Sequence, residues 1–248
     1  MDEQQSLRIG SMISEFSNPS MPRIFDAAGF DFAILDGEHG AFDFETVAAM
    51  ANVAVGTRLD LFVRVPQLTR DYLGTYLDAG VAGIVAPMVE TPEQAALLVD
   101  ATRYPPLGKR GISVTRAHSG FHVDDLQAYL AAANARVEVF AQIETRASLE
   151  AVDEIVATPG LTGLFVGPND LLGDIGTPGD NSNPELHEAI RRVMSAAAAH
   201  GKIGGIITGN AELLTIAREA GASILSVNSD VGYLLRAATA ELAKVRRL

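Results

Sequence analysis

Residues 137–170 read VEVFAQIETRASLEAVDEIVATPGLTGLFVGPND, and this stretch decides the fold. A mainly apolar run, Val137 to Ile143, leads into a segment of helical character, and a second apolar run, Gly163 to Val166, follows. Continuous apolar runs of this length are typical of strands covered on both faces, as in a parallel sheet. The stretch therefore predicts one strand–helix–strand unit with two parallel strands.

The same alternation continues along the chain in both directions. Helix starts are indicated at Thr91-Pro92-Glu93-Gln94 and at Asn210-Ala211-Glu212, and Gly29, Gly80 and Gly221 stand where helices should end. The eight expected strands are Ile9 to Ser14, Phe32 to Asp36, Leu61 to Val65, Gly83 to Met88, Val137 to Ile143, Gly163 to Val166, Lys202 to Ile207 and Ser223 to Val227. Eight such repeats favour an α/β fold, a single (β/α)8 TIM-type barrel over residues 1–248 with an extended C-terminal helix at about 230–246.

Composition narrows the range of functions. The 248 residues carry 19 basic and 31 acidic side chains, a formal charge of −12, which argues against nucleic acid and anionic membrane as partners. The absence of cysteine excludes disulfides, cysteine-ligated metal centres and a thiol nucleophile. Met1 to Gln5 lack the pattern of a signal peptide, and no apolar run is long enough to span a membrane, so we expect a cytoplasmic protein.

Two carboxylates stand where neighbouring strands end. Glu144 follows the run that ends at Ile143, and Asp170 follows the run that ends at Val166. Active sites of such barrels lie at the C-terminal ends of the strands, and carboxylate oxygens suit Mg²⁺ or Mn²⁺. The alternative is that each carboxylate only caps the helix that follows it, and the spacing does not choose between the two.

Three other charged groups follow the second and third strands. Arg64 lies in an otherwise apolar run, so its guanidinium should emerge at the barrel mouth and meet an anion, or else form a structural salt bridge with Asp36 or Glu38. His39 lies at a strand end and could act as a general base oriented by Asp78, although a single histidine is more often structural or solvent-facing. Asp36 and Glu38 are expected to contact and orient the side chains that bind the substrate.

Other classes of cofactor lack their sequence signals. The only lysines, Lys109, Lys202 and Lys244, do not follow a predicted strand, which argues against a Schiff-base aldolase and against pyridoxal phosphate. The chain contains no P-loop and no G-x-G-x-x-G element, so nucleotide binding has no support either.

Taken together, six motifs resemble the metal-dependent pyruvate aldolases of the HpcH/HpaI type, within the phosphoenolpyruvate/pyruvate barrel superfamily. The resemblance extends from about Leu7 to Ala243. The motifs, in chain order, are Leu35-Asp36-Gly37-Glu38-His39, Val63-Arg64-Val65-Pro66, Ala86-Pro87-Met88-Val89-Glu90-Thr91, Thr102-Arg103-Tyr104-Pro105-Pro106-Leu107-Gly108-Lys109-Arg110-Gly111, Gln142-Ile143-Glu144-Thr145 and Phe165-Val166-Gly167-Pro168-Asn169-Asp170-Leu171.

The resemblance implies a role for each matching residue. Glu144 and Asp170 would hold a divalent ion, Mg²⁺ or Mn²⁺ with Co²⁺ as a third choice, which chelates a 2-oxo acid. Arg64 would contact the keto oxygen, while His39, oriented by Asp78, would manage the proton. The implied substrate-binding positions are Gln142, Gly167, Pro168, Asn169 and Arg116.

The implied reaction is that of a class II aldolase. A 4-hydroxy-2-oxo acid would be cleaved reversibly to pyruvate, or a close 2-oxo acid, and an aldehyde. Two alternatives remain: decarboxylation of an oxaloacetate-like acid at the same site, and a non-catalytic barrel that binds a 2-oxo acid. The resemblance also implies a homo-oligomer, a trimer or hexamer, with the C-terminal helix packed on a neighbouring subunit. Leu172 and Asn228 depart from the family motif. These departures bear on which aldehyde the enzyme accepts more than on the type of reaction.

Overall fold

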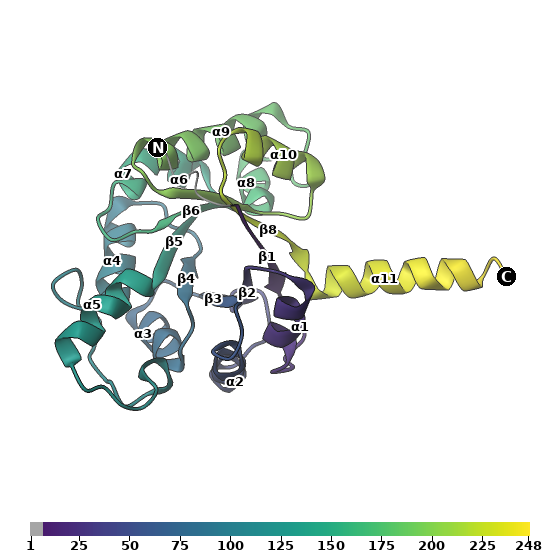
Figure 1. Ribbon diagram of the computed structural model, residues 1–248. Coiled ribbons are helices and arrows are strands. Elements are labelled where there is room, and N and C mark those ends of the chain that lie inside the picture. The colour runs from purple at the N-terminus through teal and green to yellow at the C-terminus, as the bar shows by residue number, and fades with distance from the viewer. Residues whose placement is uncertain (1–6) are drawn as a thin grey trace, which may run out of the picture.

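The computed structural model describes residues 7–248 as a closed barrel of eight parallel strands surrounded by helices (Figure 1). The predicted TIM-type barrel is therefore confirmed, while Met1 to Gln5 lie outside the described residues. The strands are β1 (Arg8–Ile13), β2 (Phe32–Asp36), β3 (Asp60–Arg64), β4 (Gly83–Ala86), β5 (Glu138–Ile143), β6 (Gly163–Val166), β7 (Ile203–Ile207) and β8 (Ile224–Ser229). The helices are α1 (Met21–Ala28), α2 (Phe44–Ala54), α3 (Arg70–Ala79), α4 (Pro92–Thr102), the 3₁₀ turn η1 (Ala117–Ser119), α5 (Leu126–Arg136), α6 (Arg146–Glu150), α7 (Val152–Val156), α8 (Pro168–Ile175), α9 (Pro184–Ala199), α10 (Ala211–Glu219) and α11 (Asp230–Val245).

Most predicted strands agree with the observed ones to within one residue, and two differ at their C-terminal ends. β4 ends at Ala86, two residues early, and Met88 has a φ of 53°, which an extended strand does not allow. β8 runs two residues beyond Val227, to Ser229, because an irregularity in its pairing with β1 keeps the extra residues beside that strand. Both differences lie at the mouth of the barrel.

Aromatic rings fill the inside of the barrel. Phe140 and Phe165 stand with ring centroids 4.9 Å apart, and Phe62 continues the layer at 5.8 Å from Phe140. Phe32 completes it at 5.5 Å from Phe62, and all four rings are fully buried. Gly10 on β1 leaves room for this layer, since a side chain there would overlap the Phe32 ring.

A charged cluster closes the barrel below the aromatic layer. The Arg8 guanidinium binds Glu138 at 2.8 Å and Asp60 at 2.8 Å, both at the N-terminal ends of their strands. Its Cζ atom lies 5.8 Å from the Phe32 ring centroid and 5.5 Å from that of Phe62, within the range of a cation–π contact. We call these three charged residues the floor cluster.

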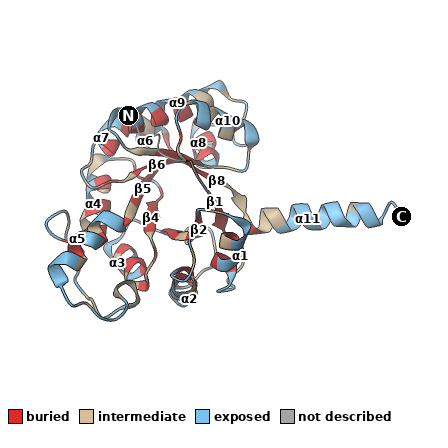
Figure 2. Cartoon of the chain, in the orientation of Figure 1, coloured by how far each residue is buried: buried red, intermediate tan, exposed pale blue. Residues whose placement is uncertain are grey.

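The outer helices bury their apolar faces against the barrel (Figure 2). Their starts follow local capping chemistry: the Thr91 hydroxyl and the Gln94 side chain form a capping box at α4, and the Asn210 side chain accepts from two backbone N–H groups at α10. Both starts were predicted. Gly29 and Gly80 end α1 and α3 in the left-handed conformation.

Helix α11 is the exception, because it projects away from the barrel (Figures 1 and 2). It spans Asp230–Val245, close to the predicted extent, and Asp230 is its only buried residue. Leu234 and Leu235 are 57% and 65% exposed. Among residues 7–248, no helix combines the length and apolar character needed to cross a bilayer.

Candidate active site

A pocket of about 350 Å³ opens at the C-terminal ends of the strands, above the aromatic layer. Eight of the residues predicted for the site line it: Asp36, His39, Arg64, Gln142, Gly167, Pro168, Asn169 and Asp170. They come from β2, β3, β5 and β6 or directly follow those strands. The predicted convergence of strand ends is therefore found in the folded chain.

Arg64 is fixed at the base of this pocket by two carboxylates. Its Nε and Nη2 donate to the Asp36 carboxylate at 3.0 and 2.7 Å, and its Nη1 lies 3.2 Å from Glu38 Oε2. The structural salt bridge considered as an alternative is thus present, and the guanidinium still lines the pocket. Burial alone would raise the pKa of Asp36, but the hydrogen bond and charge of Arg64 outweigh it and lower that pKa.

The pKa of Glu38 is shifted in the opposite direction to that of Asp36. Its Oε2 is buried and accepts no hydrogen bond in the described structure. Burial raises the pKa of Glu38, and the charge of Arg64 opposes this only in part. The two acids beside Arg64 are therefore unequal, one held ionised and the other more readily protonated.

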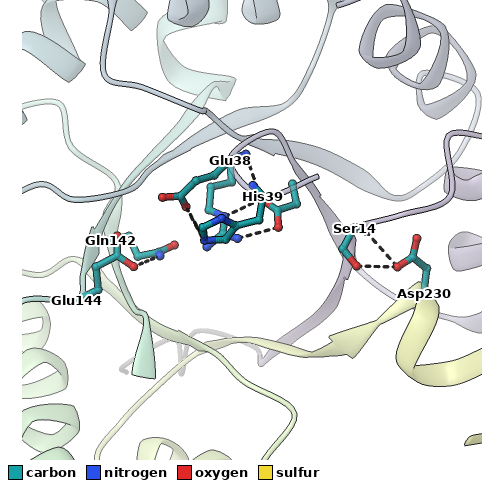
Figure 3. Close-up of polar contacts among 8 residues, drawn as sticks. Ser14, Glu38, His39, Gln142, Glu144 and Asp230 are labelled. Carbon is teal, nitrogen blue, oxygen red and sulfur yellow. Dashed lines mark hydrogen bonds and ion pairs between the residues drawn. The ribbon is translucent and has the colours of Figure 1, made fainter. Parts of the chain in front are cut away.

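Glu144 lies deeper, and its side chain is held by two donors. Its Oε1 accepts from the Met88 backbone N–H at 2.7 Å, and its Oε2 accepts from the Gln142 amide (Figure 3). Only 1% of Glu144 is exposed, and this burial raises its pKa, with further repulsion from Glu38 and Asp170. Burial of a carboxylate among other acids is costly unless a cation or a proton compensates.

Asp170 lies in the first turn of α8, directly after β6, and lines the pocket. Gly167, which precedes this helix, is the point of close approach, since a Cβ there would lie 2.5 Å from Glu144 Oε2. The sequence therefore keeps a glycine where the two acidic segments meet. The alternative that each acid caps the helix after it is not found, because Thr145 caps α6 and Gly167 stands at the cap position of α8 without a side-chain bond. Asp170 lies inside the first turn of α8 instead.

His39 stands at the rim with its side chain 64% exposed. Its Nε2 lies 4.0 Å from Glu38 Oε2, and its backbone N–H donates to Asp36 at 3.2 Å (Figure 3). Among residues 7–248, Glu38 is the acid that pairs with the imidazole. The predicted partner, Asp78, is elsewhere.

Asp78 lies near the end of α3, two residues before Gly80 and close to the start of β4. Its carboxylate pairs with Arg110 at 2.6 Å and stands 3.5 Å from His118 Nε2. Because helices run back from the mouth to the N-terminal ends of the strands, this places Asp78 at the opposite end of the barrel from His39. The pair predicted from sequence does not form within one chain.

Arg116 is also remote from the pocket. It precedes η1, whose residues line a second hollow together with Asp60, Ala82 and Glu138 at the N-terminal ends of the strands. The loop around Arg116 was expected to reach the substrate, but a long loop alone does not show toward which end of a barrel it folds. Arg116 contributes nothing to the pocket of its own chain.

The remaining wall of the pocket comes from β1, β7 and β8. Its polar members are Ser14, Thr208, Ser226, Asn228 and Ser229. Ser14 and Ser226 were missed as site residues, although Ser226 and Asn228 alternate along β8 as residues on one face of a strand do. That alternation was the available signal.

Comparison with known proteins places this site in context. Residues 11–237 match the family described as HpcH/HpaI aldolase/citrate lyase. The chain belongs to that family. It is 36% identical over 231 residues to the hydroxypyruvate/pyruvate aldolase of Roseovarius nubinhibens, covering 93% of this chain and 90% of that protein. It is 39% identical over 234 residues to the 5-keto-4-deoxy-D-glucarate aldolase of Escherichia coli strain K12, covering 93% and 89%.

A solved structure of the family has the same fold throughout. The HpcH/HpaI aldolase from Desulfitobacterium hafniense superposes with a TM-score of 0.93 at 29% identity, over 98% of this chain and 94% of that one. The chain is accordingly an enzyme of the family, a carbon–carbon lyase.

Proposed function

We propose that this enzyme is a divalent metal-dependent, class II aldolase that cleaves a 4-hydroxy-2-oxo acid reversibly to pyruvate, or a close 2-oxo acid, and an aldehyde. One observation carries the proposal: the buried Glu144, directly after β5, and Asp170, at the start of α8, repel each other electrostatically, and Asp170 lines the pocket that also holds the buried Arg64. The names of the two aldolases compared above support the same reaction class.

The two acids fit a divalent ion. Among residues 7–248 no three His, Cys, Asp or Glu side chains gather as a complete ligand set. Mg²⁺ is nevertheless held in many enzymes by one or two carboxylates, with water and substrate oxygens in the other positions. The buried Glu144 is repelled by Glu38 and Asp170, and Gln142 Oε1 is buried without a partner, so the cluster gains from a cation.

Glu144 and Asp170 would hold Mg²⁺ or Mn²⁺, with Co²⁺ as a third choice, and Gln142 would order the surroundings. A divalent ion bound there supplies Lewis-acid polarisation of the 2-oxo acid carbonyl. No nucleotide, pyridoxal phosphate or Schiff-base lysine enters the proposed reaction.

Arg64 faces the oxygen on which negative charge develops. In the cleavage direction the C4 hydroxyl loses its proton, the C3–C4 bond breaks, and its electron pair moves through C2 onto the keto oxygen. Aldehyde and enolate result, and a proton returned to C3 gives pyruvate. The bidentate contact with Asp36 orients Arg64 toward that oxygen without reorganisation during the reaction. The backbone at Gly167 to Asp170, where α8 begins, suits the substrate carboxylate.

His39 is the proposed carrier of the proton, acting through water at the exposed rim. Glu38 is the acid beside it in this chain, 4.0 Å away. Asp78 and Arg116 could reach a pocket only if it belonged to a neighbouring copy. We extend the proposal to a homo-oligomer, a trimer or hexamer, in which α11 with its exposed Leu234 and Leu235 packs on another subunit. Such an enzyme would work in the cytoplasm.

The test is proton exchange from pyruvate in deuterated water, because it needs no knowledge of the aldehyde. The methyl signal, followed by proton NMR, should decay with Mn²⁺ or Mg²⁺ present and persist after EDTA treatment. Persistence of the signal with Mn²⁺ shown to be bound would contradict the proposal. Release of carbon dioxide from oxaloacetate without any aldol cleavage would favour the decarboxylase alternative.

A further inference from the structure

The far wall of the pocket contains an unusual residue at the end of β8. Resting on the proposed aldolase function, we propose that Asn228 recognises a hydroxyl group on the aldehyde fragment and thereby determines specificity. The aldehyde is then a neutral hydroxyaldehyde, and in the cleavage direction the substrate carries a hydroxyl on the carbon next to C4.

The backbone of Asn228 is strained. Its φ is 126°, in a region that residues with a Cβ rarely adopt and that glycine tolerates. The residue also lies in an irregularity of the sheet: Gly10 pairs with Ser226 and Met12 with Ser229, so β8 has one residue more than β1 between the two pairs. Such bulges next to active sites redirect a side chain.

Specific contacts hold this strained arrangement in place. The Ser11 hydroxyl donates to the Asn228 carbonyl oxygen at 2.8 Å. On the other side Gly232 lies against the amide, because a Cβ at Gly232 would overlap Asn228 Oδ1 and stand 3.0 Å from its Cγ. Ser11 on β1 therefore holds the Asn228 backbone, while the Asn228 amide lies against Gly232 in the first turn of α11 and close to Gly209 after β7.

The amide of Asn228 lacks the partner that burial demands. Its Nδ2 is buried and has no hydrogen-bond partner in the described structure, and the same is true of Ser226 Oγ, two residues earlier on the strand. Both residues line the pocket. Buried polar groups are normally paired, and an unpaired group at a binding site is commonly satisfied by the ligand. Strain and a missing partner at one residue both point to a function.

The character of this wall decides the chemistry of the ligand. Near Asn228 the lining consists of Ile207, Thr208, Ser226 and Ser229, all uncharged, while the charged residues of the pocket, among those described, lie on β2, β3 and α8. Hydroxyl and amide groups can each donate and accept, which matches a ligand hydroxyl. A second carboxylate would meet no basic side chain on this wall.

The experiment compares two aldehydes of nearly equal size in condensation with pyruvate and Mn²⁺. Glycolaldehyde carries the hydroxyl, and propanal replaces it with a methyl group. For the wild type we expect kcat/KM to favour glycolaldehyde by about tenfold or more, the factor that one well-formed hydrogen bond provides. Asn228→Gly should reduce this ratio to about one. Asn52→Ala, an exposed position on α2, is the matched control and should keep the wild-type ratio.

A folding defect is not expected to obscure the result. Glycine suits a φ of 126°, so Asn228→Gly should unfold at the same temperature as the wild type or higher, whereas Asn228→Ala should unfold lower. An unchanged aldehyde ratio in Asn228→Gly would overturn the inference, as would a wild-type preference for succinic semialdehyde over glycolaldehyde. A wild type without metal-dependent exchange of pyruvate protons would instead refute the proposed function itself.

Discussion

The Asp230 carboxylate binds Ser14 twice, accepting from its backbone N–H at 3.1 Å and from its hydroxyl at 2.9 Å (Figure 3). The same carboxylate accepts from the backbone N–H groups of Glu15 and Phe16, at 3.1 and 2.9 Å. Asp230, the first residue of α11, therefore fixes residues 14–16, which follow β1. These bonds join the segments that follow β1 and β8, the two strands whose pairing closes the barrel.

Replacement of Asp230 by Asn should destabilise the enzyme by about 1–3 kcal/mol, since a neutral amide cannot accept all of these hydrogen bonds. Burial alone would raise the pKa of Asp230, but the backbone donors, Phe16 first among them, lower it below its ordinary value of 3.8. The ionised group therefore stabilises the fold above about pH 4, and this contribution is lost as the pH falls through the lowered pKa.

Urea unfolding at neutral pH and at pH values below about 4 measures both effects. The wild type should lose more stability on acidification than Asp230→Asn, because the variant no longer has this group to protonate. Parallel loss of stability in the two proteins would show that Asp230 is not a source of the acid sensitivity.

Asp36→Asn should lower both stability and turnover. The change leaves the buried Arg64 with Glu38 as its remaining acid, and removing one partner of a buried ion pair costs about 3 kcal/mol or more. Loss of the bidentate contact should also reduce kcat by about tenfold or more, because the guanidinium is no longer preoriented. Asp26→Asn, which breaks an ion pair with the exposed Arg58, should cost less than about 1 kcal/mol and leave kcat unchanged.

Glu144→Gln and Asp170→Asn should each weaken Mn²⁺ binding by about 100-fold or more, measured by isothermal titration calorimetry. EDTA treatment of the wild type should abolish aldol cleavage, and added Mn²⁺ should restore it. Glu150→Gln, a change at an exposed position on α6, provides the control and should bind Mn²⁺ as the wild type does. Full activity in either of the first two variants would rule out the proposed metal site.

Gly10→Ala tests the packing inside the barrel. The added methyl group would overlap the Phe32 ring, so we expect a loss of about 1–3 kcal/mol in the free energy of unfolding. Gly74→Ala in α3 is the contrasting change, because nothing lies within 4 Å of its Cβ. There the better helix propensity of alanine should raise stability by up to about 1 kcal/mol. Thermal denaturation of both variants distinguishes the two outcomes.

The assembly can be tested at α11. Leu234→Glu combined with Leu235→Glu places two charges on the exposed part of the helix and should reduce the molar mass measured by light scattering, if α11 packs on another subunit. An unchanged mass would contradict the proposed role of α11. Glu241→Gln, a change on the same helix that adds no charge, serves as the control and should leave the molar mass unchanged.

Sequence alone predicted the barrel well because its signals are local. Apolar runs such as Phe32 to Asp36 mark strands without reference to distant residues, and the capping group at Thr91 marks a helix start in the same way. Glu144, Asp170 and Arg64 could be placed near the mouth for a related reason: in a parallel barrel, residues at or just after the C-terminal end of a strand lie at the mouth wherever the strand stands.

The rest depended on long-range placement. Asp78 and Arg116 do not follow a strand, so the position of strand ends does not predict where they lie. Their segments fold toward the N-terminal ends of the strands. In the sequence Asn228 was visible only as a departure from the family pattern, because its positive φ and the register shift beside it belong to the pairing of β8 with β1. Pairing between the two ends of the chain is not a local property.

The floor cluster of Arg8, Asp60 and Glu138 and the aromatic layer above it fill the barrel beneath the pocket, so that among the described residues the pocket opens toward the C-terminal ends of the strands. Gln142 is 1% exposed at the inner end of the pocket, while His39 stands at the rim. In the proposed reaction the 2-oxo acid occupies the inner end and the aldehyde lies between it and solvent. The kinetics should accordingly follow a compulsory order: on cleavage the aldehyde departs before pyruvate, and on synthesis pyruvate must arrive before the aldehyde.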